Sequence, residues 1–155
     1  MSVIARSIKN YQVEITADNH RWVSDEPRGV GDDAGPNPYD LLLGALGACK
    51  AITVQMYARK KGWLLEGVQA ALSTYKIHAK DCEDCESDPN AKIDLIEVEI
   101  SFQGELTPEQ IQRLTEISER CPVHQTLVSE TKIRTRLVMN GSERAEIKGR
   151  KDEAD

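Results

Sequence analysis

The stretch Gly35-Pro-Asn-Pro-Tyr-Asp-Leu-Leu-Leu-Gly-Ala-Leu-Gly-Ala-Cys49 decides how the centre of this chain folds, because it predicts the start of a long helix. A proline suits the first turn, and Asp40 suits the positive end of a helix dipole. Gly62 is a good terminator, so we expect a helix over Asp40–Lys61. Residues 41–49 are apolar on every side, which predicts that the first half of this helix is buried all round.

Upstream of the helix, the pattern predicts a hairpin followed by a loop. The alternating side chains of Tyr11–Ala17 are typical of a strand, and we expect His20–Asp25 to return beside it. Pro27–Pro38 holds three glycines and three prolines in twelve residues, a composition that regular structure does not tolerate. We therefore expect a loop there.

Downstream, two more strands are expected, over Val68–Ala79 and Ile93–Gln103, with the acidic loop Asp81–Asn90 between them. The apolar residues of the second strand do not follow a single alternation. This predicts a β-bulge near Ile96–Glu97.

A second helix is predicted from Thr107, which can cap it together with Gln110. It should end near Cys121, because Pro122 disfavours a helical conformation in the residue before it. A last strand is expected over Thr131–Val138.

This order of elements predicts an α+β fold, with an antiparallel-rich sheet and two main helices gathered on one side. The length of 155 residues suits one domain, which we expect over residues 1–140. The polar, mixed-charge tail over residues 141–155 is expected to be disordered.

Composition excludes several classes of function. The net charge of −6 and the pI of about 5.2 argue against a nucleic-acid partner. The N-terminus lacks the apolar core of a signal peptide, and the longest apolar stretch, residues 41–49, is too short to span a bilayer. We expect a cytoplasmic protein with no membrane partner.

Two cysteines, Cys49 and Cys121, lie 72 residues apart, so only tertiary folding could bring them together. Cytoplasmic cysteines are more often reactive thiols or metal ligands than structural disulfides. One thiol inside an apolar helix and one at a helix-ending proline indicate a redox pair. Either cysteine taken alone could instead be a small buried hydrophobic residue.

The stretch 35–49 and the sequence Cys121-Pro-Val-His124 resemble the two signatures of the OsmC/Ohr family. The intervening order of helices and strands matches as well, and the resemblance covers about Tyr11–Val138. It implies an OsmC-like fold, an intertwined homodimer and two active sites at the dimer interface. It also implies thiol-dependent reduction of peroxides, chiefly organic hydroperoxides.

The resemblance further implies a role for each cysteine. Cys49 would be the peroxidatic thiol, which attacks the peroxide oxygen and becomes a sulfenic acid. Cys121 would be the resolving thiol, which condenses with that sulfenic acid into a disulfide. An external dithiol would then reduce the pair, and no metal, flavin or other cofactor is required.

A thiolate inside an apolar helix needs a nearby cation, because desolvation raises the pKa of a thiol. In the family, an arginine held by a glutamate supplies this charge. Here Tyr39 stands at the matching glutamate position and Asp40 follows it, which places the chain in a divergent branch. Arg28 lies at nearly the family's spacing and is our choice for the arginine; Arg21 is the other candidate. Arg28 could also be a solvated loop charge, and Asp40 a helix-end charge.

The residues expected to bind substrate are Tyr39, Asp40, Leu42, Leu46 and His124. His124 could polarise Cys121 or line the pocket. An alternative function is also open: a non-catalytic protein that binds a lipid-like molecule in an apolar pocket near Leu42, Leu46 and Cys49.

A second cluster contains Cys82 and Cys85, with His78 nearby as a possible third metal ligand. A lone CxxC motif can be half of a zinc site or a redox pair. The acidic residues around it would raise the thiol pKa values, which disfavours reactive thiolates. An acidic surface loop, a weak metal site and a thiol relay all remain open for this cluster.

Overall fold

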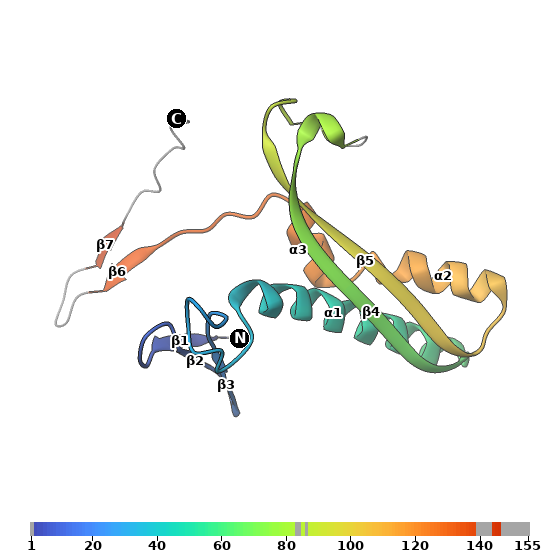
Figure 1. The fold of residues 1–155 in the computed structure, drawn as a ribbon. Helices are drawn as coiled ribbons and strands as arrows, with labels where there is room; N and C mark the ends of the chain where they lie inside the picture. The colour runs from blue at the N-terminus through green and yellow to red at the C-terminus, as the bar shows by residue number, and fades with distance from the viewer. Residues whose placement is uncertain (1, 83–84, 86, 139–143, 147–155) are drawn as a thin grey trace.

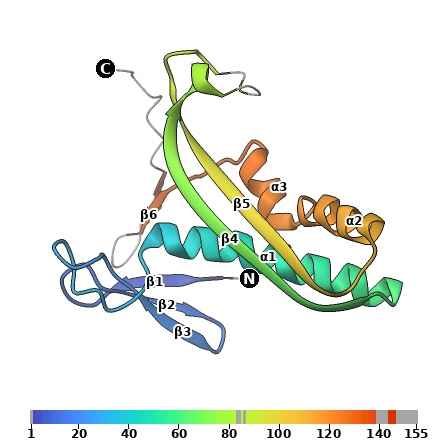
Figure 2. The same cartoon turned by 45° about the vertical axis from the view of Figure 1, so that its right-hand side comes forward.

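The structure is a computed structural model, and it describes residues 2–82, 85, 87–138 and 144–146. Its elements are, in chain order, β1 (Ile4–Ser7), β2 (Val13–Ala17), β3 (His20–Ser24), α1 (Pro38–Lys61), β4 (Leu64–His78), η1 (Ala79–Asp81), β5 (Lys92–Glu105), α2 (Pro108–Ser118), α3 (Pro122–Val128), β6 (Arg136–Val138) and β7 (Arg144–Glu146). In Figures 1 and 2, the long hairpin β4–β5 crosses α1, and the sheet β1–β3 lies near the N-terminal end of that helix. All paired strands are antiparallel, so the predicted α+β class is confirmed.

Helix α1 begins and ends where its sequence signals lie. The side chain of Asn37 accepts hydrogen bonds from the backbone N–H groups of Tyr39 (2.9 Å) and Asp40 (3.0 Å). Asp40 in return accepts from the backbone N–H of Asn37 at 3.1 Å, which completes a capping box. Gly62 adopts a left-handed conformation (φ 68°) at the other end. The predicted helix is confirmed and starts at Pro38.

The hairpin β4–β5 is longer and more regular than predicted. Its strands are paired from Leu64↔Glu105 to His78↔Lys92, and the register shifts only between Leu65 and Gly67. The predicted bulge near Ile96–Glu97 is therefore wrong. The alternation of apolar and polar residues is interrupted there because the adjacent residues Leu95 and Ile96 are both half-buried. The strand pairing is nevertheless continuous at these residues.

The first half of α1 is not buried all round, which corrects that prediction. Only one stripe with a four-residue spacing is buried, formed by Leu46, Lys50, Val54 and Ala58. On other faces Ile52 is 56% exposed and Met56 is 68% exposed. Strand β4 and helices α2 and α3 make the main contacts of the described elements with α1.

The core lies where α1 meets α2. Four buried residues form it, namely Val54, Ala58, Leu114 and Ile117. Half-buried side chains from the hairpin and the connecting segments pack around them, including Trp63, Val68 and Phe102. By length and composition alone α1 is the one described helix that could cross a membrane, a test that the core helix of a globular fold also passes.

The N-terminal sheet contains a strand that the sequence patterns did not indicate. Strand β1 pairs with β2, while β2 and β3 form the predicted hairpin. The four residues of β1 are all exposed and show no apolar alternation. The strand is therefore defined by its hydrogen bonds to β2, because its own side chains show no pattern that would predict a strand.

The expected last strand over Thr131–Val138 is wrong in its first five residues. Only Arg136–Val138 forms a strand, β6, and its partner is β7. The alternating sequence from Thr131 has no strand to pair with among the described residues, and Ile133 is left exposed. Of the expected tail over residues 141–155, only β7 lies within the described residues.

Asp25 organises the loop that leads into α1. Its carboxylate is buried and accepts hydrogen bonds from the backbone N–H groups of Glu26 (2.8 Å), Asp32 (3.1 Å) and Ala34 (3.0 Å). The N–H of Ala34 is the largest cause that lowers the pKa of Asp25, and burial opposes it. The Asp25 carboxylate therefore holds this loop in place, in a segment whose glycines and prolines do not support a helix or strand.

We expect Asp25 to make stability depend on pH at the acidic end. Its native pKa is lowered from the ordinary value of 3.8, so its contribution is fully present above that pH and is lost as the pH falls through the native value. Asp25→Asn should lower the melting temperature at pH 7 and flatten the acid-induced fall below pH 4. Asp18→Asn, at an exposed turn residue, is the control. Equal pH profiles for the wild type and Asp25→Asn would contradict this role.

Candidate functional site

Tertiary folding makes Cys49 and Cys121 neighbours, close enough for Cys49 to raise the pKa of the Cys121 thiol. Cys49 lies in the first half of α1 and is partly buried, whereas Cys121 is fully buried at the N-cap of α3. The packing of α3 on α1 is what joins them, because the two residues are 72 positions apart in the chain. Both cysteines are free thiols.

The sulfur of Cys121 is held by the turn that starts α3. The α2 helix ends at Ser118, Pro122 occupies the first position of α3, and the backbone N–H of His124 donates to Cys121 Sγ at 3.3 Å. Burial raises the pKa of the Cys121 thiol, and the neighbouring Cys49 raises it further. The His124 N–H and the charge of Lys50 oppose this rise.

Lys50 is a site residue that the sequence reasoning missed. It directly follows Cys49, and its side chain is buried, with 4% exposure. Its Nζ donates to the carbonyl oxygen of Ser118 at 3.3 Å and lies 3.4 Å from Nδ1 of His124. The signal that could have found it is its spacing, because Lys50 falls between Leu46 and Val54 on the buried stripe of α1.

Two adjoining cavities lie along the side of α1 that carries Leu42, Leu46 and Lys50, and neither free cysteine is among their lining residues. The larger, of about 390 Å³, is lined by Leu46, Lys50, Asp94, Ile96, Val98, Glu119, His124, Leu127 and Val128. The smaller, of about 280 Å³, is lined by Tyr39, Leu42, Leu43, Thr74, Asp94, Ile96 and Leu127. They share three lining residues, and most of the side chains in both are apolar. Together they form a mostly apolar hollow with Lys50 and His124 at one side.

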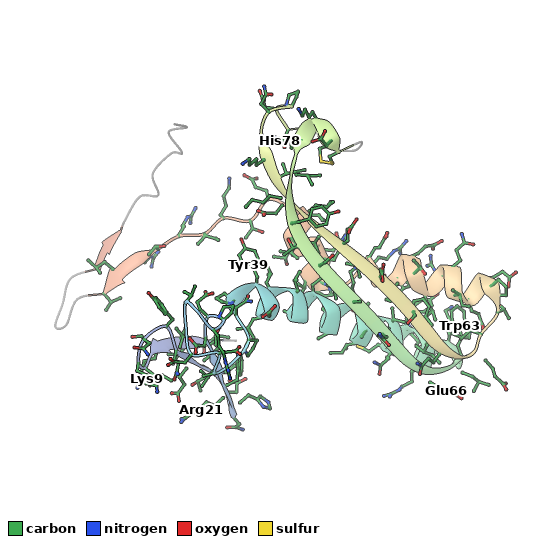
Figure 3. The ribbon with its side chains drawn as sticks, in the orientation of Figure 1. Lys9, Arg21, Tyr39, Trp63, Glu66 and His78 are labelled. Atoms are coloured by element: carbon green, nitrogen blue, oxygen red, sulfur yellow. A yellow bond between two sulfur atoms is a disulfide. The ribbon has the colours of Figure 1, made fainter. Side chains whose placement is uncertain are left out.

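The structure divides the predicted substrate-binding residues between these cavities. Leu46 and His124 line the larger one, and Tyr39 and Leu42 line the smaller one. Figure 3 shows Tyr39 at the N-terminal end of α1. Asp40 lies apart from them, in an open groove of about 450 Å³ between α1 and β4, and its carboxylate serves the capping box.

Neither candidate arginine is paired with the site. The side chain of Arg28 is 87% exposed, and its Nε lies 3.7 Å from a carboxylate oxygen of Asp33 in the same loop. Arg21 lies on β3 and pairs with Glu14 at 3.3 Å; Figure 3 shows it in the N-terminal sheet. Among the described residues, Lys50 is a cation whose charge lowers the pKa of Cys121, and Arg28 stays a prediction without a contact to support it.

The second cysteine cluster forms a bond instead of a metal site. Cys82 and Cys85 are joined in a disulfide, with a Cα–Cα distance of 5.5 Å, near the tip of the β4–β5 hairpin. Figure 3 shows His78 at that tip, at the opposite end of the hairpin from Trp63 and Glu66. Across the residues that the structure describes, no group of three or more His, Cys, Asp or Glu side chains could hold a metal ion. As placed here, the weak metal candidates His78, Cys82 and Cys85 do not form a site.

Comparison with known proteins then identifies the family. The family profile of OsmC-like proteins matches residues 31–136, a span that includes α1, both free cysteines and the hairpin. The chain belongs to the OsmC-like protein family. The resemblance inferred from the two cysteine signatures is thereby confirmed. No curated protein matches the OsmC-like chain.

Solved structures of other OsmC-like proteins share the fold at low sequence identity. A putative osmotic stress induced and detoxification response protein from Psychrobacter arcticus has a TM-score of 0.65 at 16% identity, covering 81% of this chain and 87% of its own. An OsmC-like protein from Mycoplasma pneumoniae has a TM-score of 0.64 at 18% identity, with 81% and 85% covered. An organic hydroperoxide resistance protein OsmC from Legionella pneumophila has a TM-score of 0.58 at 18% identity, with 82% and 88% covered.

Proposed function

We propose that this OsmC-like chain is a thiol peroxidase that reduces organic hydroperoxides through Cys49 and Cys121. The observation that supports the proposal is the proximity of these two free thiols, which come from distant parts of the chain and are joined by the packing of α3 on α1. Two cysteines that form a reversible disulfide must lie close together, whereas two cysteines that only fill the core can lie anywhere in it. The Legionella neighbour, described as an organic hydroperoxide resistance protein and predicted redox protein, supports a redox role in stress defence.

The proposed reaction has three balanced steps. The Cys49 thiolate attacks one peroxide oxygen and breaks the O–O bond, which leaves a sulfenic acid on Cys49. The departing alkoxide takes up the proton that the Cys49 thiol lost on ionising and leaves as an alcohol. The Cys121 sulfur then attacks the Cys49 sulfur and displaces the hydroxyl group as water, which leaves a disulfide. An external dithiol finally reduces this disulfide by thiol–disulfide exchange and is itself oxidised.

The different burial of the two thiols supports this assignment of roles. Cys49 is partly accessible, so a peroxide can approach it, whereas Cys121 is fully buried and held by the N–H of His124. The two cavities of about 390 and 280 Å³, which Leu42 and Leu46 of α1 help to line, can hold an apolar organic group. We therefore expect bulky organic hydroperoxides to react faster than hydrogen peroxide.

The test is peroxide consumption by the purified protein with dithiothreitol as the reductant. Cumene hydroperoxide and hydrogen peroxide are compared at equal concentration, and product alcohol is measured. The expected result is catalytic turnover with a preference for cumene hydroperoxide. If neither peroxide is consumed faster than in the protein-free control, the peroxidase proposal fails.

We further propose that the chain is an intertwined homodimer. Large apolar side chains are exposed on α1, on the N-terminal sheet and on α3, among them Met56, Ile4 and Val128. Patches of this kind on a globular chain mark interaction surfaces. A second copy of the chain can cover them.

Light scattering coupled to size-exclusion chromatography should give about twice the chain mass of 17.3 kDa. Met56→Glu, which places a charge on an exposed apolar face of α1, should shift the protein toward the monomer because a buried unpaired charge is costly. Gln55→Glu, at the exposed neighbouring position, is the matched control for added charge. A monomeric wild type at micromolar concentration would refute the dimer.

The mostly apolar hollow also favours a second candidate function, the binding of a lipid-like molecule without catalysis. The two functions differ in one measurement. A binding protein would take up an apolar fluorescent fatty acid and leave cumene hydroperoxide unchanged, whereas the proposed peroxidase consumes the peroxide.

A further inference from the structure

Lys50 is a buried charged residue that the two-thiol reaction does not yet use. Its side chain is 4% exposed, in the apolar helix α1. An ammonium group buried among neutral partners loses its hydration, and a nearby anion can offset that cost. The ion pairs found among the described residues do not include Lys50. Among the described residues, therefore, no carboxylate lies close enough to form an ion pair with Lys50 and balance its charge.

The contacts of Lys50 place its charge against two residues that flank the proposed resolving cysteine. Its Nζ donates to Ser118 O at 3.3 Å, at the end of α2, and lies 3.4 Å from Nδ1 of His124 in α3. His124 donates its backbone N–H to Cys121 Sγ at 3.3 Å. Ser118 and His124 thus flank Cys121 in the chain, and Lys50 contacts both of them. Its positive charge favours the thiolate form of Cys121 against the effect of burial.

Other charged groups face the same cavity from the neighbouring elements. Asp94 of β5, Glu119 after α2 and His124 of α3 line it together with Lys50. Asp94 is paired with Lys76 at 2.7 Å, so its charge is already balanced. The carboxylate of Glu119 would disfavour a thiolate, since like charges repel. Among the residues that line this cavity, Lys50 therefore supplies the lysine or arginine charge, and no other lining residue is of either type.

We propose that Lys50 is a positioning residue whose charge stabilises the Cys121 thiolate as that thiolate attacks the sulfenic acid on Cys49. The inference rests on the proposed function and deepens it. The Cys121–Cys49 sulfur bond forms, the sulfur–oxygen bond of the sulfenic acid breaks, and the departing hydroxide takes up the proton lost from Cys121 to form water. Lys50 keeps its own proton and acts through its charge. Lys50 would thus stabilise the Cys121 thiolate in the way that the family resemblance implies for an arginine at the Cys49 thiolate.

The direct test is a titration of Cys121 in a Cys49→Ser background, without peroxide. The ultraviolet absorbance of the thiolate is followed against pH in the parent, in Lys50→Met, which has similar volume and no charge, and in Lys50→Arg. Lys50→Met should move the midpoint upward by about one pH unit, which lowers the thiolate fraction about tenfold at a fixed lower pH. Lys50→Arg should restore it toward the parent. An unchanged midpoint in Lys50→Met would overturn the proposal.

A kinetic test separates the two steps in the protein that retains Cys49. After one equivalent of cumene hydroperoxide, Lys50→Met should form the Cys49 sulfenic acid at the parental rate and close the disulfide about tenfold more slowly. A sulfenic-acid trapping reagent and mass spectrometry measure both. Parental closure would count against Lys50. Melting curves check the fold, and Lys50→Gln replaces Lys50→Met if that variant fails to fold.

The two proposals can fail separately. A wild type that consumes no peroxide, yet shows the shifted Cys121 titration in the Lys50 variants, would refute the peroxidase and retain the charge effect. An active peroxidase in which the Lys50→Met titration is unchanged would refute Lys50 alone.

Discussion

Replacing Cys49 with serine is expected to abolish peroxide turnover, with a loss of at least about a thousandfold. A hydroxyl group is a far weaker nucleophile than a thiolate at neutral pH, and removal of a catalytic nucleophile causes losses of this order or larger. The measurement is alcohol formation from cumene hydroperoxide under a dithiol reductant. Cys49 is partly buried, and serine differs from cysteine only by oxygen in place of sulfur, so the replacement disturbs the packing little.

Two further variants make the result specific. Cys121→Ser should still react once with peroxide, but its Cys49 sulfenic acid should persist because no resolving thiol is present. The double variant Cys82→Ser/Cys85→Ser removes the disulfide at the hairpin tip and should retain turnover. Parental activity in Cys49→Ser would show that another group attacks the peroxide, and the assignment would fail.

The second large effect is expected at Leu114, in the core between α1 and α2. Its side chain is 0% exposed and lies in one cluster with Val54, Ala58 and Ile117. Leu114→Ala removes buried methyl and methylene groups and leaves a cavity, which typically costs about 2–5 kcal/mol of unfolding free energy. Urea denaturation at one fixed protein concentration measures the change, since any dimerisation would couple stability to concentration.

Gln112→Ala is the control for Leu114→Ala, because Gln112 is exposed on the same helix. Its unfolding free energy should stay within about 0.5 kcal/mol of the parent. A Leu114→Ala variant as stable as Gln112→Ala would mean that the contact between α1 and α2 is not the core of the fold.

Where elements begin and end was predictable wherever a local signal exists. The caps of α1 at Asn37, Asp40 and Gly62 and the capping box of α2 at Thr107 and Gln110 each involve residues no more than a few positions apart. The strands were less predictable because their partners define them. Strand β1 forms by pairing with β2 despite an uninformative sequence, and Thr131–Thr135 alternates like a strand but has none to pair with among the described residues.

The candidate site was predictable in its chemistry and less so in its geometry. The two thiols stood out from their surrounding sequences, and the packing of α3 on α1 makes them neighbours. The expected arginine lies apart at the surface, where Arg28 pairs with Asp33. Lys50 was overlooked because a lysine in an apolar helix is usually at its surface, and only the packing of α2 and α3 buries it.

By itself, the sequence determined the central helix, its caps, the α+β class and the two cysteines of interest. All of these follow from interactions between residues close in the chain, or from residue type. The tertiary structure alone decided that Cys49 meets Cys121, that Lys50 is buried beside them, and that one face of α1 remains open. These features depend on how α1 packs against β4, α2 and α3. Contacts of that kind join residues far apart in the chain, and their geometry is set by the packing of whole elements and not by any local pattern.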